Sequence, residues 1–280
     1  MLVTEDRMNE GDGILLSHPD LGLGHHIAGA LGRLGRRTSG PQIHSSQNSF
    51  GAMFITPMEL AWNSPMPEVE IARLSTWIHS CLEKNPLLHV IWVLPQSTPA
   101  EQIATLEKLT ERSTFFFAPP VYGFRDAGLM QQALNALKHA PGDLSKSPPN
   151  SDTTTPLLFA GDLAALLVSA PGQKQLFGKK LRMPATTNTL VDWQRSFTKH
   201  FQPAISWMEK IASRLSGNNP WENVLGKMGF SVSPTVEGLE SALDFFPSSL
   251  SPLDRTLKQA ADQHHRHPEL ESHFPPGRAL

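Results

Sequence analysis

The stretch that decides the fold is GILLSHPDLGLGHHIAGAL, residues 13–31. It opens with a short apolar run, residues 13–17, of the kind that forms a buried strand. A turn with Gly22 and Gly24 follows, and apolar residues then return at helical spacing until Gly35, which is a helix stop signal. Strand, glycine-bearing turn and helix in this order predict the first unit of a parallel α/β sheet.

The same alternation continues downstream of this unit. Strands are predicted at residues 52–55, 87–94 and 113–118, and helices at residues 68–83, 99–111 and 126–139. The strand at 87–94 is apolar on both faces, as expected for a sheet that helices cover on both sides. The sequence therefore predicts a three-layer α/β domain with a parallel sheet.

The second half of the chain reads differently. Residues 141–155 are rich in Ser, Thr, Pro, Asp and Asn and form the clearest linker. We therefore expect the α/β domain at residues 1–145, a smaller and mostly helical lobe at 146–247 whose strands can return to the main sheet, and an extended or flexible tail at 248–280. Within the lobe we expect strands at 156–159 and 179–183, and helices at 161–169, 190–201, 204–215, 221–228 and 236–245.

Composition and charge exclude several classes of protein. Apolar residues make up 39% of the 280 residues and charged residues 18%, which excludes disorder throughout. The 24 Lys and Arg against 26 Asp and Glu leave a net charge of -2, which argues against a broadly basic nucleic-acid-binding surface and leaves only a local basic patch open. The longest apolar run, residues 163–168, is far shorter than the roughly 20 residues that a membrane span needs.

The compartment is predicted from two further features. Residues 1–12 are acidic, whereas a secretory signal starts basic and then turns apolar. The one cysteine, Cys81, allows no internal disulfide and lies on the apolar face of the predicted helix 68–83, as a small core residue would. We therefore expect a cytoplasmic protein.

Four stretches carry a resemblance to a known family. They are ILLSHPDLGLGHHI (14–27), LHVIWV (88–93), APPVYG (118–123) and LLFAGDLAAL (157–166). In order and spacing they resemble the extended short-chain dehydrogenase/reductase family, the branch that holds NAD-dependent nucleotide-sugar epimerases and dehydratases. The resemblance covers residues 13–200. It implies a Rossmann-like fold and ligands of the nucleotide or nucleotide-sugar class, with NAD(P) as the usual cofactor.

The chain departs from this family at the catalytic pair. The family uses a Tyr, which gives or takes a proton, and a Lys four residues later, which lowers the pKa of that Tyr. This chain has one tyrosine, Tyr122, and the residue four positions on is Asp126. Only one helix fits between Leu94 and Phe115, so the unit that carries the pair in the family is predicted to be deleted. Tyr122 and Asp126 remain the candidate acid/base residues for relocated chemistry.

The glycine-rich turn departs as well. When Gly24 is matched to the last glycine of the family's Gly-x-x-Gly-x-x-Gly pattern, His18 and Leu21 stand at the other two positions. Side chains there would block the close approach of a pyrophosphate to the backbone. No carboxylate ends the strand at 52–57 to bind a ribose. Gly22 and Gly24 are therefore the candidate cofactor-binding residues, and no cofactor is expected in the ordinary mode, although NAD(P) stays open.

Other polar groups favour structural interpretations. His25 and His26 at the helix start are expected in a packed or solvated first turn. Asp162 follows Gly161 and is a candidate helix N-cap at the junction of the two lobes. His264, His265, His267 and His273 lie in the predicted tail, so no metal site is expected.

Three functions stay open on these grounds. The first is a non-catalytic relative of the epimerases and dehydratases, a pseudoenzyme that acts as a binding or scaffold subunit with a protein partner or a second copy. The second is an active enzyme whose chemistry has moved to Tyr122 or Asp126. The third is a sensor that reports a dinucleotide or metabolite to a partner. Tyr122, Asp162, Gly22 and Gly24 are expected around one crevice at the carboxyl ends of the strands, narrowed by His18 and Leu21.

Overall fold

The computed structural model describes residues 13–41, 50–56, 66–124, 130, 133–134, 154–201, 236 and 238–266. Among them, seven strands form one sheet in the order β10-β8-β5-β4-β3-β1-β2. Every neighbouring pair in this sheet is parallel. The strands are β1 (Gly13–Leu16), β2 (Thr38–Ser39), β3 (Phe50–Ile55), β4 (His89–Pro95), β5 (Ser113–Ala118), β8 (Lys180–Arg182) and β10 (Glu240–Ser241). The predicted parallel α/β fold is confirmed.

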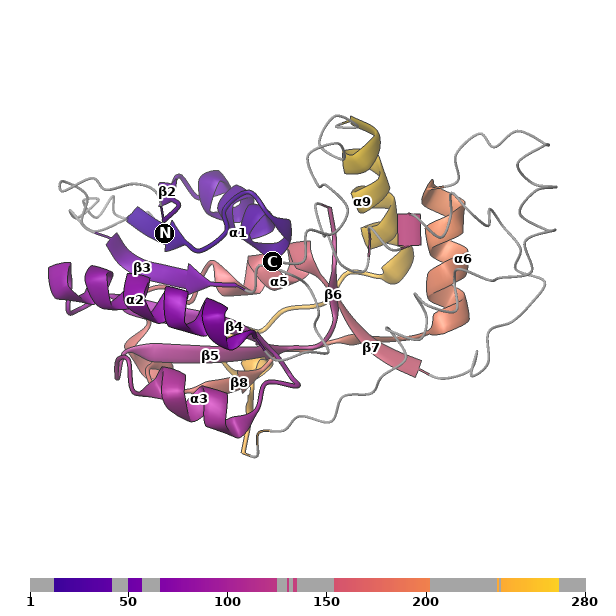
Figure 1. The fold of residues 1–280 in the computed structure, drawn as a ribbon. Coiled ribbons are helices and arrows are strands. Elements are labelled where there is room, and N and C mark those ends of the chain that lie inside the picture. Colours follow the sequence, from indigo (N-terminus) through magenta and orange to yellow (C-terminus); the bar gives the residue numbers. More distant parts are fainter. Residues whose placement is uncertain are drawn as a thin grey trace, which may run out of the picture.

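Helices cover both faces of the sheet (Figure 1). Helices α1 (Gly22–Arg33) and α5 (Ala160–Leu167) share one apolar core with the sheet, and α2 (Glu68–Lys84) and α3 (Ala100–Glu107) share another. Successive side chains of a strand point to opposite faces, so Ile14 and Leu16 join the first core and Leu15 joins the second. This is why the strands read as unbroken apolar runs.

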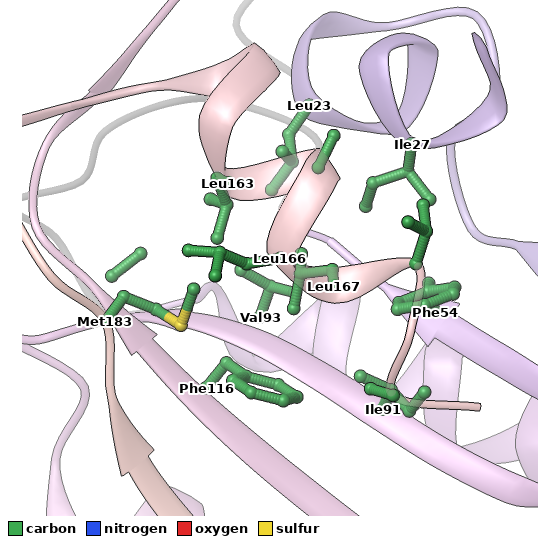
Figure 2. Packing of buried hydrophobic residues seen from close by; sticks show 14 of the residues in the cluster. Leu23, Ile27, Phe54, Ile91, Val93, Phe116, Leu163, Leu166, Leu167 and Met183 are labelled. Carbon is green, nitrogen blue, oxygen red and sulfur yellow. The ribbon is translucent and has the colours of Figure 1, made fainter. Parts of the chain in front are cut away.

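The core under α1 and α5 is packed from both helices onto the sheet. In Figure 2, Leu23 and Ile27 of α1 and the leucines of α5 point toward Phe54, Ile91, Val93 and Phe116 of the strands. Leu166 and Leu167 of α5 come from the second half of the chain, beyond the predicted linker. The Rossmann-like core therefore needs residues from both halves.

A smaller lobe stands beside the sheet. It contains strands β6 (Val121–Tyr122), β7 (Thr154–Phe159) and β9 (Thr186–Thr189), and helices α6 (Leu190–Phe201) and α9 (Leu253–Arg266). The strand order is β6-β7-β9, with β6 and β7 parallel and β7 and β9 antiparallel. Its own apolar core joins Tyr122 and Phe159 to Trp193, Phe197 and Leu257.

The prediction of an extended tail from residue 248 is wrong for residues 253–266, which form α9. Leu253, Leu257, Ala260 and Ala261 lie on one side of that helix and are buried against the lobe. Proline is tolerated before the first turn of a helix, so Pro252 opens α9 instead of breaking it.

The remaining predicted helices are partly wrong, partly confirmed and partly outside the described residues. The predicted helix at 236–245 is wrong in its described part, which forms β10 and a 3-10 turn, η2 (Ala242–Asp244). A second 3-10 turn, η1 (Lys174–Leu176), precedes β8. Residues 96–112 hold one helix, α3, as predicted. The predicted helices at 204–215 and 221–228 lie outside the described residues, and so does most of that at 126–139.

Candidate functional site

The strand order places a topological switch point between β1 and β3. Strand β1 is followed by α1 on one face of the sheet, whereas β3 is followed by α2 on the other. In open α/β sheets, ligands bind outside the carboxyl ends of the strands at such a point. The candidate site is therefore bordered by the turn between β1 and α1, the residue that ends β3, and the first turn of α2.

Gly24 keeps one of the structural tasks of the glycine-rich turn. A Cβ at Gly24 would overlap with the backbone carbonyl group of His18, so only glycine allows this close approach of helix to turn. Gly22, the first residue of α1, has a φ of +37°, a left-handed value that also favours glycine. The amide of His25 then donates to the carbonyl of Leu21 over 3.1 Å and continues the helix.

The ends of β1 and β3 are joined directly below this turn. The hydroxyl of Ser17 donates to the carbonyl of Thr56 over 3.1 Å, and the amide of Thr56 donates back to Ser17 Oγ over 2.9 Å. The amide of Ser17 donates to the carbonyl of Phe54 over 3.0 Å. Both Ser17 and Thr56 are buried. The backbone groups of Thr56 are therefore already used at the floor of the switch point.

The His18 side chain crosses the switch point from the β1–α1 turn to helix α2. Its Nε2 lies 3.5 Å from Glu70 Oε1, and the two side chains are only 9% and 14% exposed. His18 comes from the β1–α1 turn, and Glu70 lies in the first turn of α2, on the opposite face of the sheet. The pair thus crosses the position where the fold offers a ligand site.

Pro19 fills the other side of the turn. A Cβ at Gly40 would lie 3.2 Å from Pro19 Cγ, so the proline ring packs against the residue that follows β2. Strand β2 is the neighbour of β1, and dinucleotide-binding folds carry at its end an acidic residue that binds the ribose hydroxyls. The strand at 52–55, which was expected to lead to this position, is β3 on the other side of β1, so that expectation is wrong. Gly40 and Pro41 follow β2 instead, and neither carries a carboxylate.

The segment around Tyr122 forms a second junction, between α1 and the lobe. His26 Nε2 lies 3.2 Å from the carbonyl oxygen of Phe124. A Cβ at Gly123 would lie 2.8 Å from the Cβ of Ala160 and 2.9 Å from His26 Nε2, so glycine is needed where these three segments meet. Burial, with a smaller effect from neighbouring His25, lowers the pKa of His26 to about 4. His26 is therefore a neutral packing residue, as predicted for a packed first turn.

Tyr122 is held inside the lobe. Its hydroxyl lies 2.6 Å from Thr256 Oγ1, and Thr256 in turn donates to the carbonyl of Leu253 over 2.8 Å. Because the Thr256 proton is used in that second bond, the Tyr122 hydroxyl is the donor to Thr256. Tyr122 is 1% exposed, and burial, together with the nearby Asp162 carboxylate, raises the pKa of its phenol.

Asp162 also binds the segment that leads into α9. Its two carboxylate oxygens accept from the amide of Ser251 over 2.8 Å and from the Ser251 hydroxyl over 2.9 Å. The prediction that Asp162 is a helix N-cap is wrong, because α5 begins at Ala160 and the N-cap position is Phe159. Asp162 instead fastens one lobe segment to the start of α5.

The predicted site residues lie in two segments, the β1–α1 turn and the lobe junction, and His26 of α1 contacts the second through Phe124 and Gly123. Gly22 and Gly24 lie in the turn at the switch point. Tyr122 and Asp162 lie at the lobe junction, where each binds the C-terminal segment 251–256. Asp126 lies outside the described residues. The described residues contain no cluster of metal-ligating side chains, and no helix among them is long and apolar enough to span a membrane.

Sequence reasoning missed the partners of the predicted residues. These partners are Glu70, Thr56, Ser251 and Thr256, and each contacts a residue between 39 and 134 positions away in the sequence. No motif links such distant positions. For Glu70, the only signal is an acidic residue in the first turn of a helix, which the helix dipole already explains.

Comparison with known proteins gives structural relatives only. No known family pattern and no curated protein sequence matches the chain. The fold is similar to that of the Bordetella bronchiseptica enzyme WbmF in complex with NAD+ and UDP, with a TM-score of 0.57 and 12% identity over 94% of this chain and 95% of that one.

Two further solved structures show the same fold. The epimerase Mth375 of Methanothermobacter thermautotrophicus matches with a TM-score of 0.60 and 12% identity, over 93% of this chain and 94% of that one. Human epimerase family protein SDR39U1 (isoform 2) with NADPH matches with a TM-score of 0.57 and 14% identity, over 89% and 99%. The chain thus has the Rossmann fold of the extended short-chain dehydrogenases/reductases. The resemblance predicted from sequence is confirmed at the level of the fold.

Proposed function

We propose that this protein is a non-catalytic relative of the NAD-dependent nucleotide-sugar epimerases and dehydratases, and that it acts as a binding or scaffold subunit. One observation carries the proposal: the single tyrosine of the chain is locked in an internal hydrogen bond with Thr256. The resemblance to the family assigns proton transfer to a tyrosine, and no second tyrosine is present to perform it.

The environment of Tyr122 opposes acid/base chemistry. A tyrosine that exchanges protons near neutral pH needs a lowered pKa and access to the substrate. Burial raises the pKa of Tyr122, and the Asp162 carboxylate raises it further. The hydroxyl already donates to Thr256 inside the lobe core. Tyr122 therefore supports the lobe and stays protonated.

The lobe nevertheless keeps the contacts of a well-folded domain. Lys199 Nζ lies 3.0 Å from Asp254 Oδ1, which joins α6 to α9, and Trp193 and Phe197 are buried between the helices and the small sheet. A lobe that retains its packing without the catalytic pair fits a role in binding. The classes of partner that we propose are a nucleotide or nucleotide-sugar, a protein, or a second copy of the chain. We place the protein in the cytoplasm, since its one cysteine, Cys81, forms no internal disulfide.

A turnover assay tests the proposal. The purified protein is incubated with UDP- and GDP-linked hexoses and NAD+, NADP+ or their reduced forms, and products are separated by anion-exchange chromatography while NADH absorbance is followed. We expect no product and no change in absorbance. Turnover that Tyr122→Phe abolishes would overturn the proposal in favour of relocated chemistry at Tyr122. Turnover that survives this substitution would overturn it in favour of another catalytic residue.

Titration calorimetry with the same nucleotide-sugars then separates the two roles. Heat of binding without turnover supports a binding subunit of the sensor kind. Absence of binding favours a scaffold whose partners are proteins.

A further inference from the structure

We propose that the β1–α1 turn of this protein closes its own switch point to a dinucleotide, and that the closure is local and can be reversed. The inference rests on the proposed function, since a subunit without redox chemistry can lose its cofactor site. Three neighbouring residues, Ser17, His18 and Pro19, carry it through their contacts with β3, α2 and the end of β2.

Side chains in the β1–α1 turn occupy the space that a dinucleotide needs. A dinucleotide pyrophosphate lies against the backbone of this turn and the start of the following helix, and glycines are needed there so that the backbone can be approached. At the first of these positions the chain carries His18, whose imidazole is 9% exposed and reaches across to α2. At the second it carries Leu21, a half-buried side chain where the pattern has a glycine, directly before the first residue of α1. The residues present therefore do not fit a bound dinucleotide.

Electrostatic repulsion also disfavours a bound dinucleotide. The Glu70 carboxylate stands on the far side of the switch point, in the first turn of α2 and 14% exposed. A pyrophosphate placed between α1 and α2 would meet this negative charge at short range in a poorly hydrated position, where repulsion is stronger than in water. In this structure the His18 imidazole occupies the space beside Glu70, with its Nε2 3.5 Å from Glu70 Oε1.

The ribose side is also filled. Pro19 packs on Gly40 after β2, and no carboxylate follows that strand to receive ribose hydroxyls. Together, His18 on one side and Pro19 on the other hold the turn down over the ends of β1, β2 and β3.

The closure of the switch point can be reversed because the backbone around it is intact. The close contact of Gly24 with the His18 backbone is a backbone feature, so it survives any change of the His18 side chain. Helix α1 keeps its 12 residues, and Ser17 and Thr56 keep the floor in place. Removing the two side chains at the glycine positions should therefore restore room for a pyrophosphate without rebuilding the fold.

The test measures binding of NADH and NADPH by calorimetry and by nicotinamide fluorescence. The proteins are the full-length wild type, the double variant His18→Gly/Leu21→Gly and the single variants His18→Ala and Glu70→Gln. The matched control is Leu34→Gly/His265→Gly, which makes the same two exchanges at exposed positions away from the switch point. Thermal unfolding of each variant establishes that it is folded, and His18→Ala serves if the double glycine variant is not.

We expect no measurable binding by the wild type or the control at millimolar dinucleotide. The double glycine variant should bind at least about 100-fold more tightly than the detection limit that bounds the wild type, because backbone N–H groups of the turn become available for charge-assisted hydrogen bonds to the pyrophosphate. His18→Ala and Glu70→Gln should give smaller gains. Folded variants that bind no better than the wild type would overturn this inference and leave the proposed function standing. Tight binding by the wild type would overturn it too, whereas only turnover overturns the proposed function.

Discussion

The hydroxyl groups of Tyr122 and Thr256 lie 2.6 Å apart although 134 positions separate them in the sequence. The contact joins β6 of the small sheet to α9 near the end of the described chain. It also defines what the only tyrosine does. Its side chain holds β6 and α9 of the lobe together.

Tyr122→Phe should therefore lower stability and leave the ligand-binding properties of the protein unchanged. The substitution removes one buried hydrogen bond and keeps the ring, so the free energy of unfolding should fall by about 1 kcal/mol. Urea denaturation followed by tryptophan fluorescence measures it. Thr256→Val should cost more, since it removes the side-chain bond to the Leu253 carbonyl as well and leaves the buried Tyr122 hydroxyl without an acceptor.

A double-mutant cycle of these two substitutions provides the control. Residues that share a hydrogen bond give non-additive losses, and we expect a coupling of about 0.5–1 kcal/mol. Strict additivity would contradict the assignment of a direct Tyr122–Thr256 bond.

Acid should destabilise the protein well before its carboxylates are protonated. Burial lowers the pKa of both His26 and His89 to about 4. His89 accepts from the amide of Gly172 at Nδ1 over 3.3 Å, so its Nε2 carries the proton and donates to Thr114 Oγ1 over 2.8 Å. Protonation of Nδ1 would remove that acceptor.

Because the pKa of each histidine is lowered in the folded state, folding stability must fall as the pH falls. Between the folded pKa near 4 and the ordinary value near 6.5, the unfolded chain binds more protons, so stability is complete above about pH 6.5 and declines as the pH falls toward 4. Each histidine contributes about 3 kcal/mol to this decline. Unfolding measured at a series of pH values should show the slope, and His89→Gln should reduce it by about half. A flat profile from pH 7 to 4 would contradict the burial of these imidazoles.

Gly24→Ala should lower the stability of the protein, whereas Gly32→Ala in the same helix should not. A Cβ at Gly24 overlaps with the His18 carbonyl, whereas nothing lies within 4 Å of a Cβ at Gly32 in the same helix. Overpacking of this kind costs about 1–3 kcal/mol, while alanine in an exposed helix interior gains about 0.5–1 kcal/mol over glycine. Thermal melts of the two variants should therefore shift in opposite directions. Equal shifts would mean that the turn moves away without cost.

The strands were predictable because their signal is local. β1, β4 and β5 are apolar on both faces, and this pattern follows directly from a sheet that helices cover on both sides. β10 has two exposed residues, Glu240 and Ser241, and its pairing with β8 leaves no mark on the sequence. α9 was missed because prolines before and after it suggested an extended tail, although its apolar residues keep helical spacing.

The site residues divide in the same way. Gly24 was predictable, since a family pattern fixes its position and the close backbone contact demands glycine. The partner of His18 was not, because Glu70 is brought to it only when α1 and α2 fall on opposite faces of the sheet around the switch point. Asp162 was identified at the lobe junction but was expected to be a helix N-cap, and its contact with Ser251, 89 positions away, could not be predicted.

The hydrogen bonds between Asp162 and Ser251 attach the start of α9 to α5. Asp162 receives both the amide and the hydroxyl of Ser251, at 2.8 and 2.9 Å, directly before α9 begins. Asp162→Ala would leave both donors without a partner, and hydrogen bonds to a charged group contribute about 1.5–3 kcal/mol. We therefore expect faster amide hydrogen exchange throughout residues 253–266, where local opening starts at the released end. Exchange in α2 and α3, on the far face of the sheet, should not change.

Ser251→Ala is the graded comparison for this prediction. It removes only the hydroxyl contact, and the amide of residue 251 still donates to Asp162 Oδ2. Its effect on exchange in α9 should therefore be smaller than that of Asp162→Ala, and Asp162→Asn, which keeps one acceptor oxygen, should lie between them. If all three variants exchanged like the wild type, α9 would be held by its apolar face alone, through Leu257, Ala260 and Ala261. If Ser251→Ala matched Asp162→Ala, the hydroxyl alone would carry the attachment, and the backbone contact would contribute nothing.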